Sequence, residues 1–323
     1  MTLASATRES LPAELLEAVA AESDQPVSPG FAPLIDALLQ RFGDSLDAIV
    51  LYGSCLHSAI SLDEGIVDLY VVVDDYRKAY PERHLALFNA WLPPNVFYLE
   101  VPHQGKTLRA KYAVISTTDF EAGAREWFHS YIWARFAQPS RLLFARDSNV
   151  RQRLYAAMAH SVLTFLRSGV PALKAGRYNV EQLWTHCLLL TYAAELRAEK
   201  AGRANHLANA NLTAFTRFTA AAHPLLADIL EKQTDGYYRC LTDAATQKQA
   251  LWRWRVRRWQ GRVLSILRLA KATLTFANSV DYAAWKIERH TGVRVEVTPL
   301  LRRHPILWGL KVASRLIRRG VLH

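Results

Sequence analysis

The residues best suited to chemistry are a Gly-Ser turn and a carboxylate that follows it at a fixed distance. Gly53 and Ser54 end one hydrophobic run, and Asp68 opens the next, fourteen residues after Ser54. A glycine lets the backbone approach a phosphate, and the serine N–H and hydroxyl bind phosphate oxygens. An aspartate on the neighbouring strand is placed to bind a divalent cation that bridges those phosphates. The pattern predicts nucleotide binding at Tyr52, Gly53 and Ser54, with Asp68 as a catalytic and metal-binding residue; an ordinary tight turn and a strand-capping aspartate are the alternative.

Three further residues are candidates for the same site. Lys111 lies in an apolar run, where a lysine needs a phosphate partner or a position at the edge of a strand. Arg135 lies at the expected end of a helix, where it is either a partner of the helix dipole or a clamp for a triphosphate. The second metal ligand is unassigned, and Glu100, on an expected neighbouring strand, is the best candidate for it.

Strands and helices alternate around these candidates. Runs rich in β-branched and aromatic residues predict strands over 48–52, 67–73, 96–101 and 111–116. Two amphipathic helices are expected within 11–42, and a capping box at Thr118–Glu121 predicts a helix that continues to Arg135. Residues 151–249 have a helical pattern throughout. The fold class is therefore α/β, with a mixed sheet followed by a mainly helical domain.

Positive charge is concentrated in the last quarter of the chain. Residues 250–323 contain 16 Lys/Arg and 3 Asp/Glu, a net charge of +13, whereas the whole chain carries +11, so residues 1–249 are slightly acidic. Leu251–Ala270 and Ile306–Arg319 each predict a helix with one apolar and one basic side. Three interpretations of the first helix remain open: packing on the protein body, contact with a membrane surface, or nucleic-acid binding through interleaved Trp and Arg. Its apolar stripe comprises Trp252, Val256, Trp259, Val263, Ile266, Leu267 and Ala270.

Composition argues against several protein classes. No apolar run approaches the roughly 20 residues of a membrane span, and Met1–Ser10 lacks the basic-then-apolar order of a secretory signal. The three cysteines are odd in number and far apart, so we expect neither a disulfide framework nor a zinc knuckle. These features predict a cytoplasmic protein, and the basic C-terminal segment places it peripherally at the inner face of the membrane.

The motifs together resemble the nucleotidyltransferase superfamily and, within it, the mitochondrial phosphatidate cytidylyltransferase (mitochondrial CDP-diacylglycerol synthase) family, as a divergent, bacterial-type member. The second acid of the superfamily, two residues after the first, is Tyr70 here, and the family's glycine after Gly-Ser is Cys55. The match covers roughly residues 48–145 and is weaker near 262–290. The matching segments are Asp68–Asp75, Val96–Leu99, Lys111–Ser116, Ser130–Pro139 and Lys271–Thr275.

The resemblance implies that CMP is transferred from CTP to phosphatidic acid with Mg²⁺, giving CDP-diacylglycerol and pyrophosphate. It implies a nucleotidyltransferase-like catalytic domain over 1–145, a helical domain over 146–250 and basic amphipathic helices over 251–323. In this scheme Asp68 holds Mg²⁺, the turn at Gly53 and Ser54 holds the CTP phosphates, and Lys111 and Arg135 neutralise charge. The expected partners are CTP, phosphatidic acid and an anionic membrane surface, and not nucleic acid. Two alternatives remain open: a nucleotidyltransferase that acts on a nucleic acid, protein or small molecule, and a non-catalytic nucleotide-binding module.

Overall fold

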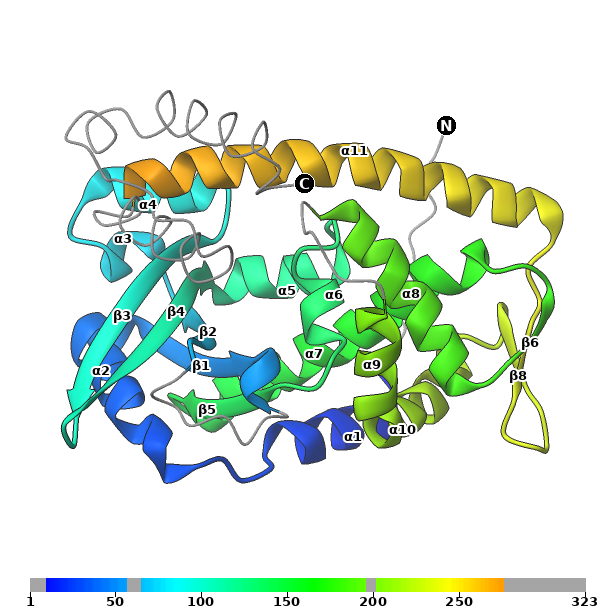
Figure 1. The fold of residues 1–323 in the computed structure, drawn as a ribbon, viewed down its shortest axis with the longest axis horizontal. Helices are drawn as coiled ribbons and strands as arrows, with labels where there is room; N and C mark the ends of the chain where they lie inside the picture. The colour runs from blue at the N-terminus through cyan, green and yellow to red at the C-terminus, as the bar shows by residue number, and fades with distance from the viewer. Residues whose placement is uncertain (1–9, 57–64, 196–201, 276–323) are drawn as a thin grey trace.

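The computed structural model describes residues 10–56, 65–195 and 202–275, and it combines a five-stranded sheet with a helical region (Figure 1). The longer helices are α1 (Ala13–Ser23), α2 (Ala32–Phe42), α4 (Arg83–Trp91), α5 (Thr117–Arg125), α7 (Ser148–Gly169), α8 (Val180–Ala194), α9 (Arg203–Ala210), α10 (Leu212–Ala222) and α11 (Ala244–Thr275). The short helices α3 (Tyr76–Ala79) and α6 (Trp133–Phe136) lie between them. The strands of the main sheet are β1 (Leu46–Tyr52), β2 (Val67–Val73), β3 (Asn95–His103), β4 (Lys106–Ser116) and β5 (Arg141–Ala145). The expected α/β part with a mixed sheet and the helical region after it are confirmed.

The main sheet has the strand order β3-β4-β2-β1-β5. Strands β2 and β4 are parallel, and the other neighbouring pairs are antiparallel. The register pairs Tyr52 with Asp68 and Asp68 with Lys111. Directly paired residues point to the same face of a sheet. The register therefore places these three predicted site residues side by side across β1, β2 and β4.

The two faces of the sheet are covered by different helices. Alternate residues along β1 and β2, such as Leu51 and Leu69, belong to one buried cluster with Leu34 and Leu38 of α2. The intervening residues, such as Tyr70, belong to a second buried cluster that continues into α7, α8 and α10. This alternation is the two-residue period of a strand that is buried on both faces. The site residues lie on the second face, toward the helical region.

The helical region is built around stacked aromatic side chains. The ring centroids of Trp184 and Phe215 are 3.7 Å apart, and the Trp184 indole N–H donates to the Thr219 hydroxyl at 2.9 Å. A small sheet of β6 (Gly176–Tyr178), β8 (Tyr238–Cys240) and β7 (Leu230–Lys232) lies beside these helices. The N-terminal helix α1 also contacts α7 and α10. Helix α1 therefore packs on the helical region, although it comes before the sheet in the sequence. The domain bounds 1–145, 146–250 and 251–323 stay a prediction.

The predicted helix from Thr118 to Arg135 is two helices in the structure. Helix α5 begins after Ser116, whose hydroxyl accepts the Asp119 N–H at 3.1 Å, and it ends at Arg125. The chain then folds back so that Ile132 packs on Gly123, where a Cβ atom would lie only 2.7 Å from Ile132 Cγ1. A larger residue at position 123 is thus incompatible with this close approach. Helix α6 follows, and it places Arg135 next to the sheet.

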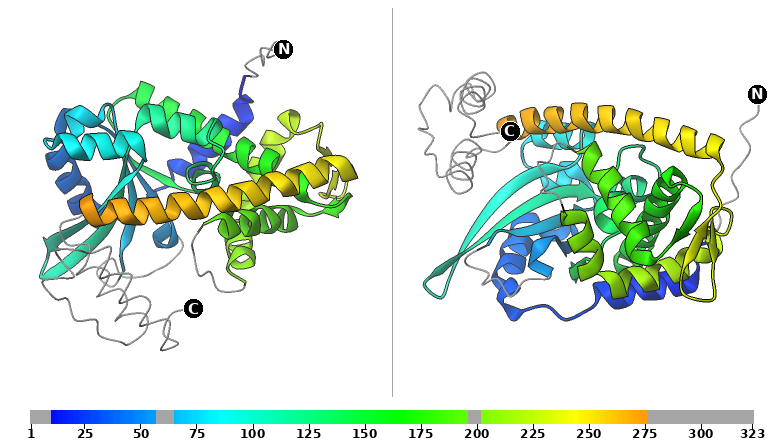
Figure 2. Two further views of the ribbon diagram at one scale, coloured as in Figure 1. Left: turned by 90° about the horizontal axis from the view of Figure 1, so that it is seen from above. Right: turned by 45° about the vertical axis from the view of Figure 1, so that its right-hand side comes forward.

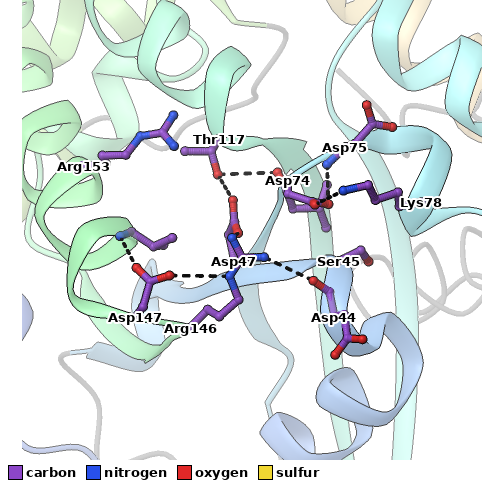
Figure 3. A network of polar contacts seen from close by, with 12 residues as sticks. Asp44, Ser45, Asp47, Asp74, Asp75, Lys78, Thr117, Arg146, Asp147 and Arg153 are labelled. Atoms are coloured by element: carbon purple, nitrogen blue, oxygen red, sulfur yellow. Dashed lines mark hydrogen bonds and ion pairs between the residues drawn. The ribbon is translucent and has the colours of Figure 1, made fainter.

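A network of polar contacts lies at the start of β1, at the end of the sheet away from Tyr52 (Figure 3). Asp47 is almost fully buried. Its carboxylate accepts from the Thr117 hydroxyl and forms an ion pair with Arg146, whose Nη2 lies 2.8 Å from Asp47 Oδ1. The Arg146 backbone N–H also donates to the Asp47 carbonyl at 2.8 Å. A buried carboxylate is tolerated only when it is paired in this way. The network therefore joins β1 to the starts of α5 and α7.

Helix α11 extends from the helical region to the sheet, along one side of the molecule (Figure 2). It packs through Trp254, Arg257 and Lys271, which are nearly fully buried. The expected apolar stripe lies on the opposite side, and Trp252 and Trp259 are 60% and 70% exposed. None of the helices within the described ranges is long and apolar enough to cross a membrane. The predicted helix at Ile306–Arg319 lies outside the described residues.

Candidate active site

A cavity of about 510 Å³ opens where the C-terminal end of β1 meets the helical region. Its walls come from the C-terminal end of β1, the start of β2, strand β4 and helices α6, α8 and α9. The lining residues are Tyr52, Gly53, Leu56, Asp68, Lys111, Ala134, Arg135, Gln138, Pro139, Thr191, Tyr192, Glu195, Arg203, His206, Leu207, Ala210 and Asn211. Of the predicted site residues, Tyr52, Gly53, Asp68, Lys111 and Arg135 are thus brought together in one cavity.

The Gly53 turn lies directly beside the Asp68 carboxylate. Gly53 has a φ of +86°, a conformation that residues with a side chain rarely adopt. A Cβ atom on Gly53 would lie 3.4 Å from Asp68 Oδ2, in ordinary contact. The turn continues with a hydrogen bond from the Leu56 N–H to the Gly53 carbonyl at 3.3 Å. The absence of a side chain at Gly53 therefore leaves the backbone and the carboxylate accessible from the same space.

Asp68 and Lys111 form an ion pair at the wall of the cavity. Asp68 Oδ1 lies 3.0 Å from Lys111 Nζ, and the two side chains remain 30% and 36% exposed. Burial disfavours the charged ammonium, but the neighbouring Tyr52 and Asp68 outweigh it and raise the pKa of Lys111. Burial, with a contribution from the Asp68 charge, also raises the pKa of Tyr52 to about 12. At neutral pH the cavity therefore presents a lysine ammonium and a neutral tyrosine hydroxyl.

Arg135 is held by three different contacts. Its Nη2 lies 3.2 Å from Glu195 Oε2, and its Nη1 donates to the Tyr131 carbonyl. Its Cζ lies 4.0 Å from the centroid of the Tyr131 ring. Burial disfavours the charge, but the Glu195 carboxylate outweighs it and raises the pKa of Arg135. Glu195 is a cavity residue that sequence reasoning missed, because it lies at the end of α8, sixty residues from its partner.

Tyr70 takes the position of the second acid that the superfamily pattern calls for, but it is not part of the cavity wall. Its side chain is fully buried, and its ring packs against Tyr52 and Phe136 with centroids 5.1 and 5.0 Å away. Burial raises the pKa of the Tyr70 hydroxyl, which has no hydrogen-bond partner among the described residues. The tyrosine thus fills the space under Tyr52 with a neutral ring.

Two predicted residues are placed differently. Glu100 does not line the cavity: on the edge strand β3 its carboxylate accepts from the Tyr98 hydroxyl at 2.8 Å and pairs with Arg109 at 3.3 Å. Its role as a metal ligand stays a prediction that this position does not favour. Ser54 begins the short helical turn Ser54–Leu56, but its side chain lies outside the described part of the structure.

The donor set of the cavity fits a magnesium ion that is shared with a nucleotide. Asp68 and Glu195 are the acidic residues of the cavity wall, and Glu195 is paired with Arg135. Within the described ranges, no three His, Cys, Asp or Glu side chains come together as a protein-held cation requires. Mg²⁺ is commonly bound through one or two carboxylates and substrate phosphates, with water completing its shell. Asp68 alone is therefore a sufficient protein ligand only when nucleotide phosphates supply further oxygens.

Comparison with known proteins identifies no family for this chain. Neither a protein-family model nor a curated protein matches the sequence. Among solved structures, the chain aligns with a nucleotidyltransferase-like protein from Exiguobacterium sibiricum 255-15 at 11% identity, over 88% of this chain and 92% of that chain, with a TM-score of 0.25. Similarity at this level assigns neither a family nor a function.

Proposed function

We propose that this protein is a nucleotidyltransferase that transfers CMP from CTP to phosphatidic acid, giving CDP-diacylglycerol and pyrophosphate. The observation that carries the proposal is one cavity that combines the Gly53 turn, the Asp68–Lys111 pair and Arg135. Exposed backbone, a carboxylate for a bridging cation and two cations are what a bound triphosphate requires. The resemblance of 48–145 to the cytidylyltransferase family supplies the choice of CTP and phosphatidic acid.

The chemistry needs positioning and charge stabilisation from the protein. A phosphate oxygen of phosphatidic acid attacks the α-phosphorus of CTP, a new P–O bond forms, and the bond to the pyrophosphate leaving group breaks. Lys111, released from Asp68, donates to the phosphate oxygens as charge moves toward the leaving group. Arg135 exchanges its contact with Glu195 for a bidentate contact with phosphate. No protein nucleophile is required, because the acceptor phosphate is already one.

Asp68 is the residue that would hold Mg²⁺. Bound there, the ion neutralises phosphate charge and orients the phosphate chain of the nucleotide. The Asp68 carboxylate that Lys111 contacts would be the ligand of that ion, and the Lys111 ammonium would then be available to the phosphate oxygens. Glu195, freed from Arg135, is a second carboxylate in the same cavity.

The outward side of α11 supports an acceptor that resides in a membrane. Trp252, Trp259 and Ile266 are exposed on it, and exposed arginines flank the stripe at Arg255 and Arg262. An amphipathic helix of this composition lies in the headgroup layer, with arginines among lipid phosphates. The proposal therefore places the protein peripherally at an anionic membrane surface, the inner face of the cytoplasmic membrane.

The test is an acceptor panel with purified protein, α-labelled CTP and Mg²⁺. Vesicles containing phosphatidic acid are compared with matched phosphatidylcholine vesicles, with RNA and with a protein mixture. Label that moves into a chloroform-soluble product only with phosphatidic acid supports the proposal. Label that moves into RNA or protein instead identifies a nucleotidyltransferase with another acceptor, and overturns the lipid assignment.

One observation favours a second candidate, a non-catalytic nucleotide-binding module. Tyr70 is a neutral, buried ring at the position of the second metal-binding acid. The same panel separates the two candidates. Binding of Mg²⁺-CTP without label transfer to any acceptor and without pyrophosphate release would identify a binding module.

A further inference from the structure

Tyr131 is in contact with guanidinium groups from two distant parts of the chain. The Cζ atoms of Arg135 and Arg268 lie 4.0 and 3.9 Å from the centroid of its ring. Arg135 belongs to α6 and lines the cavity, whereas Arg268 belongs to α11, which passes over α5 and α6 in Figure 1. The ring thus connects the surface helix to the cavity wall.

The two guanidinium groups share one aromatic ring. Each Cζ lies about 4 Å from the ring centroid, well within the roughly 6 Å reach of a cation–π contact. The face of an aromatic ring carries the negative part of its quadrupole and attracts cations. Removal of either arginine therefore removes one of the two cation contacts that hold the ring.

Arg268 is held in place from its own side. Its Nε donates to the Pro93 carbonyl at 3.3 Å, and one turn further Lys271 Nζ donates to the Pro94 carbonyl at 2.9 Å and to the Leu92 carbonyl. These contacts anchor the end of α11 to the segment between α4 and β3. Arg268 is therefore supported independently of Arg135 and of anything bound in the cavity.

We propose that Arg268 is a positioning residue, which fixes the Arg135 guanidinium in the cavity by holding the Tyr131 ring that both arginines contact. This inference rests on the proposed function, because it assigns Arg135 the task of binding phosphate. When nucleotide binds, Arg135 exchanges its hydrogen bond to Glu195 for one to a phosphate. The Tyr131 ring meanwhile keeps the plane of the guanidinium fixed. A planar guanidinium that is already oriented loses less freedom when it binds phosphate. The helix that carries the exposed tryptophans is thereby tied to the geometry of the cavity.

A double-mutant cycle on kcat for nucleotidyl transfer tests the proposal. Arg268→Met and Tyr131→Leu each lower kcat roughly tenfold, the effect expected from one desolvated cation–π contact. The double variant is no slower than the slower single variant, because both changes act through the same shared ring. Tyr131→Phe keeps the ring and retains the wild-type kcat.

The matched control is Arg257→Met, on the same inward side of α11. Arg257 donates to the Phe128 carbonyl at 2.6 Å and stacks on Trp254, with its Cζ 4.4 Å from that ring, and it is not stacked on Tyr131. Its loss lowers the melting temperature but leaves kcat unchanged. If Arg268→Met keeps more than half of the wild-type kcat, or if its effect multiplies with that of Tyr131→Leu, the positioning role is wrong.

A second measurement keeps this inference separate from the proposed function. In the ¹⁵N-labelled protein, the Arg135 Nε–H signal is shifted by the ring current of Tyr131, whether or not the protein has turnover. Arg268→Met moves that signal toward its value in Tyr131→Leu, and Arg257→Met does not. An unmoved signal in Arg268→Met overturns the positioning role even if CTP is turned over, whereas absent turnover with a moved signal overturns only the proposed function.

Discussion

Replacing Lys111 with methionine separates a catalytic cation from a structural one. The change keeps the length of the side chain and removes its charge. Both members of the Asp68–Lys111 pair remain about one-third exposed, so the pair contributes only about 0–1 kcal/mol to the free energy of unfolding. A hydrogen bond from the ammonium to a charged phosphate is worth about 1.5–3 kcal/mol. Lys111→Met should therefore lower kcat/KM for CTP roughly 10- to 150-fold with little loss of stability.

For this variant, kcat/KM is measured from pyrophosphate release at a series of CTP concentrations. The free energy of unfolding is measured by urea denaturation. Lys78→Met is the matched control, because Lys78 forms a comparable ion pair, 2.7 Å from Asp74, away from the cavity wall. We expect Lys78→Met to leave kcat/KM unchanged. The reasoning is refuted if Lys111→Met stays within twofold of the wild type, or if its activity is lost together with its stability.

Three further changes probe the turn, the far end of the sheet and a buried histidine. Gly53→Ala should lower the free energy of unfolding by about 1–2 kcal/mol, because φ at this position is +86°. It should also raise the Kd for Mg²⁺-CTP in calorimetry, because the new methyl group lies beside Asp68. An unchanged Kd would contradict the proposed site. Asp47→Ala should lower the free energy of unfolding in urea by about 2–3 kcal/mol while leaving KM unchanged. The change removes the carboxylate that accepts from the buried Thr117 hydroxyl and leaves that hydroxyl only the Val73 carbonyl, at 3.5 Å. Asp44→Ala, at an exposed side chain, is the control, and equal effects would argue against the network. Burial and the charges of Arg268 and Arg257 lower the pKa of His129 to about 3, so below pH 6.5 the unfolded chain binds a proton that the folded protein does not. As the pH is lowered from 6.5 to 3, the contribution of this residue to the free energy of unfolding should therefore fall by about 1.4 kcal/mol per pH unit. Urea denaturation at several pH values should show a flatter slope for His129→Asn than for the wild type.

The sheet was predictable where its strands are rich in β-branched residues. Val67–Val73 and Lys111–Ser116 lie within observed strands, and the parallel pairing of β2 with β4 brings Asp68 and Lys111 together. Strand β5 is a short apolar run, Arg141–Ala145, and such a run cannot be distinguished from a buried helix segment by its pattern. Its pairing with β1 is decided by tertiary contacts.

The remainder of the cavity depends on contacts between segments that are distant in sequence. Glu195, at the C-terminal end of α8, meets Arg135 of α6 through the tertiary fold, and no local sequence pattern marks it. Glu100 shows the opposite case, since a position on a neighbouring strand does not bring its carboxylate to the cavity. The Glu100 carboxylate instead contacts Tyr98 on β3 and Arg109 on β4.

Helix α11 shows what periodicity leaves open. The pattern correctly groups Trp252, Trp259 and Val263 on one side, but it does not decide which side faces the protein. Burial of Arg257 and Lys271 is possible because backbone carbonyls accept from both cations and aromatic rings cover the guanidinium. The sequence does not mark the carbonyl partners, because they lie in the segment between α5 and α6 and in the turn before β3.

The central claim is that Asp68 holds the cation through which the nucleotide is bound for transfer. The most direct measurement is the transfer of label from CTP to phosphatidic acid in the presence of Mg²⁺, by the wild type and by Asp68→Asn. An amide is a neutral, poor ligand for Mg²⁺, so the variant should form less than about a tenth of the wild-type product while keeping its fold by circular dichroism. A folded Asp68→Asn variant that retains more than a tenth of the turnover, a barrier difference below about 1.4 kcal/mol, would contradict the account.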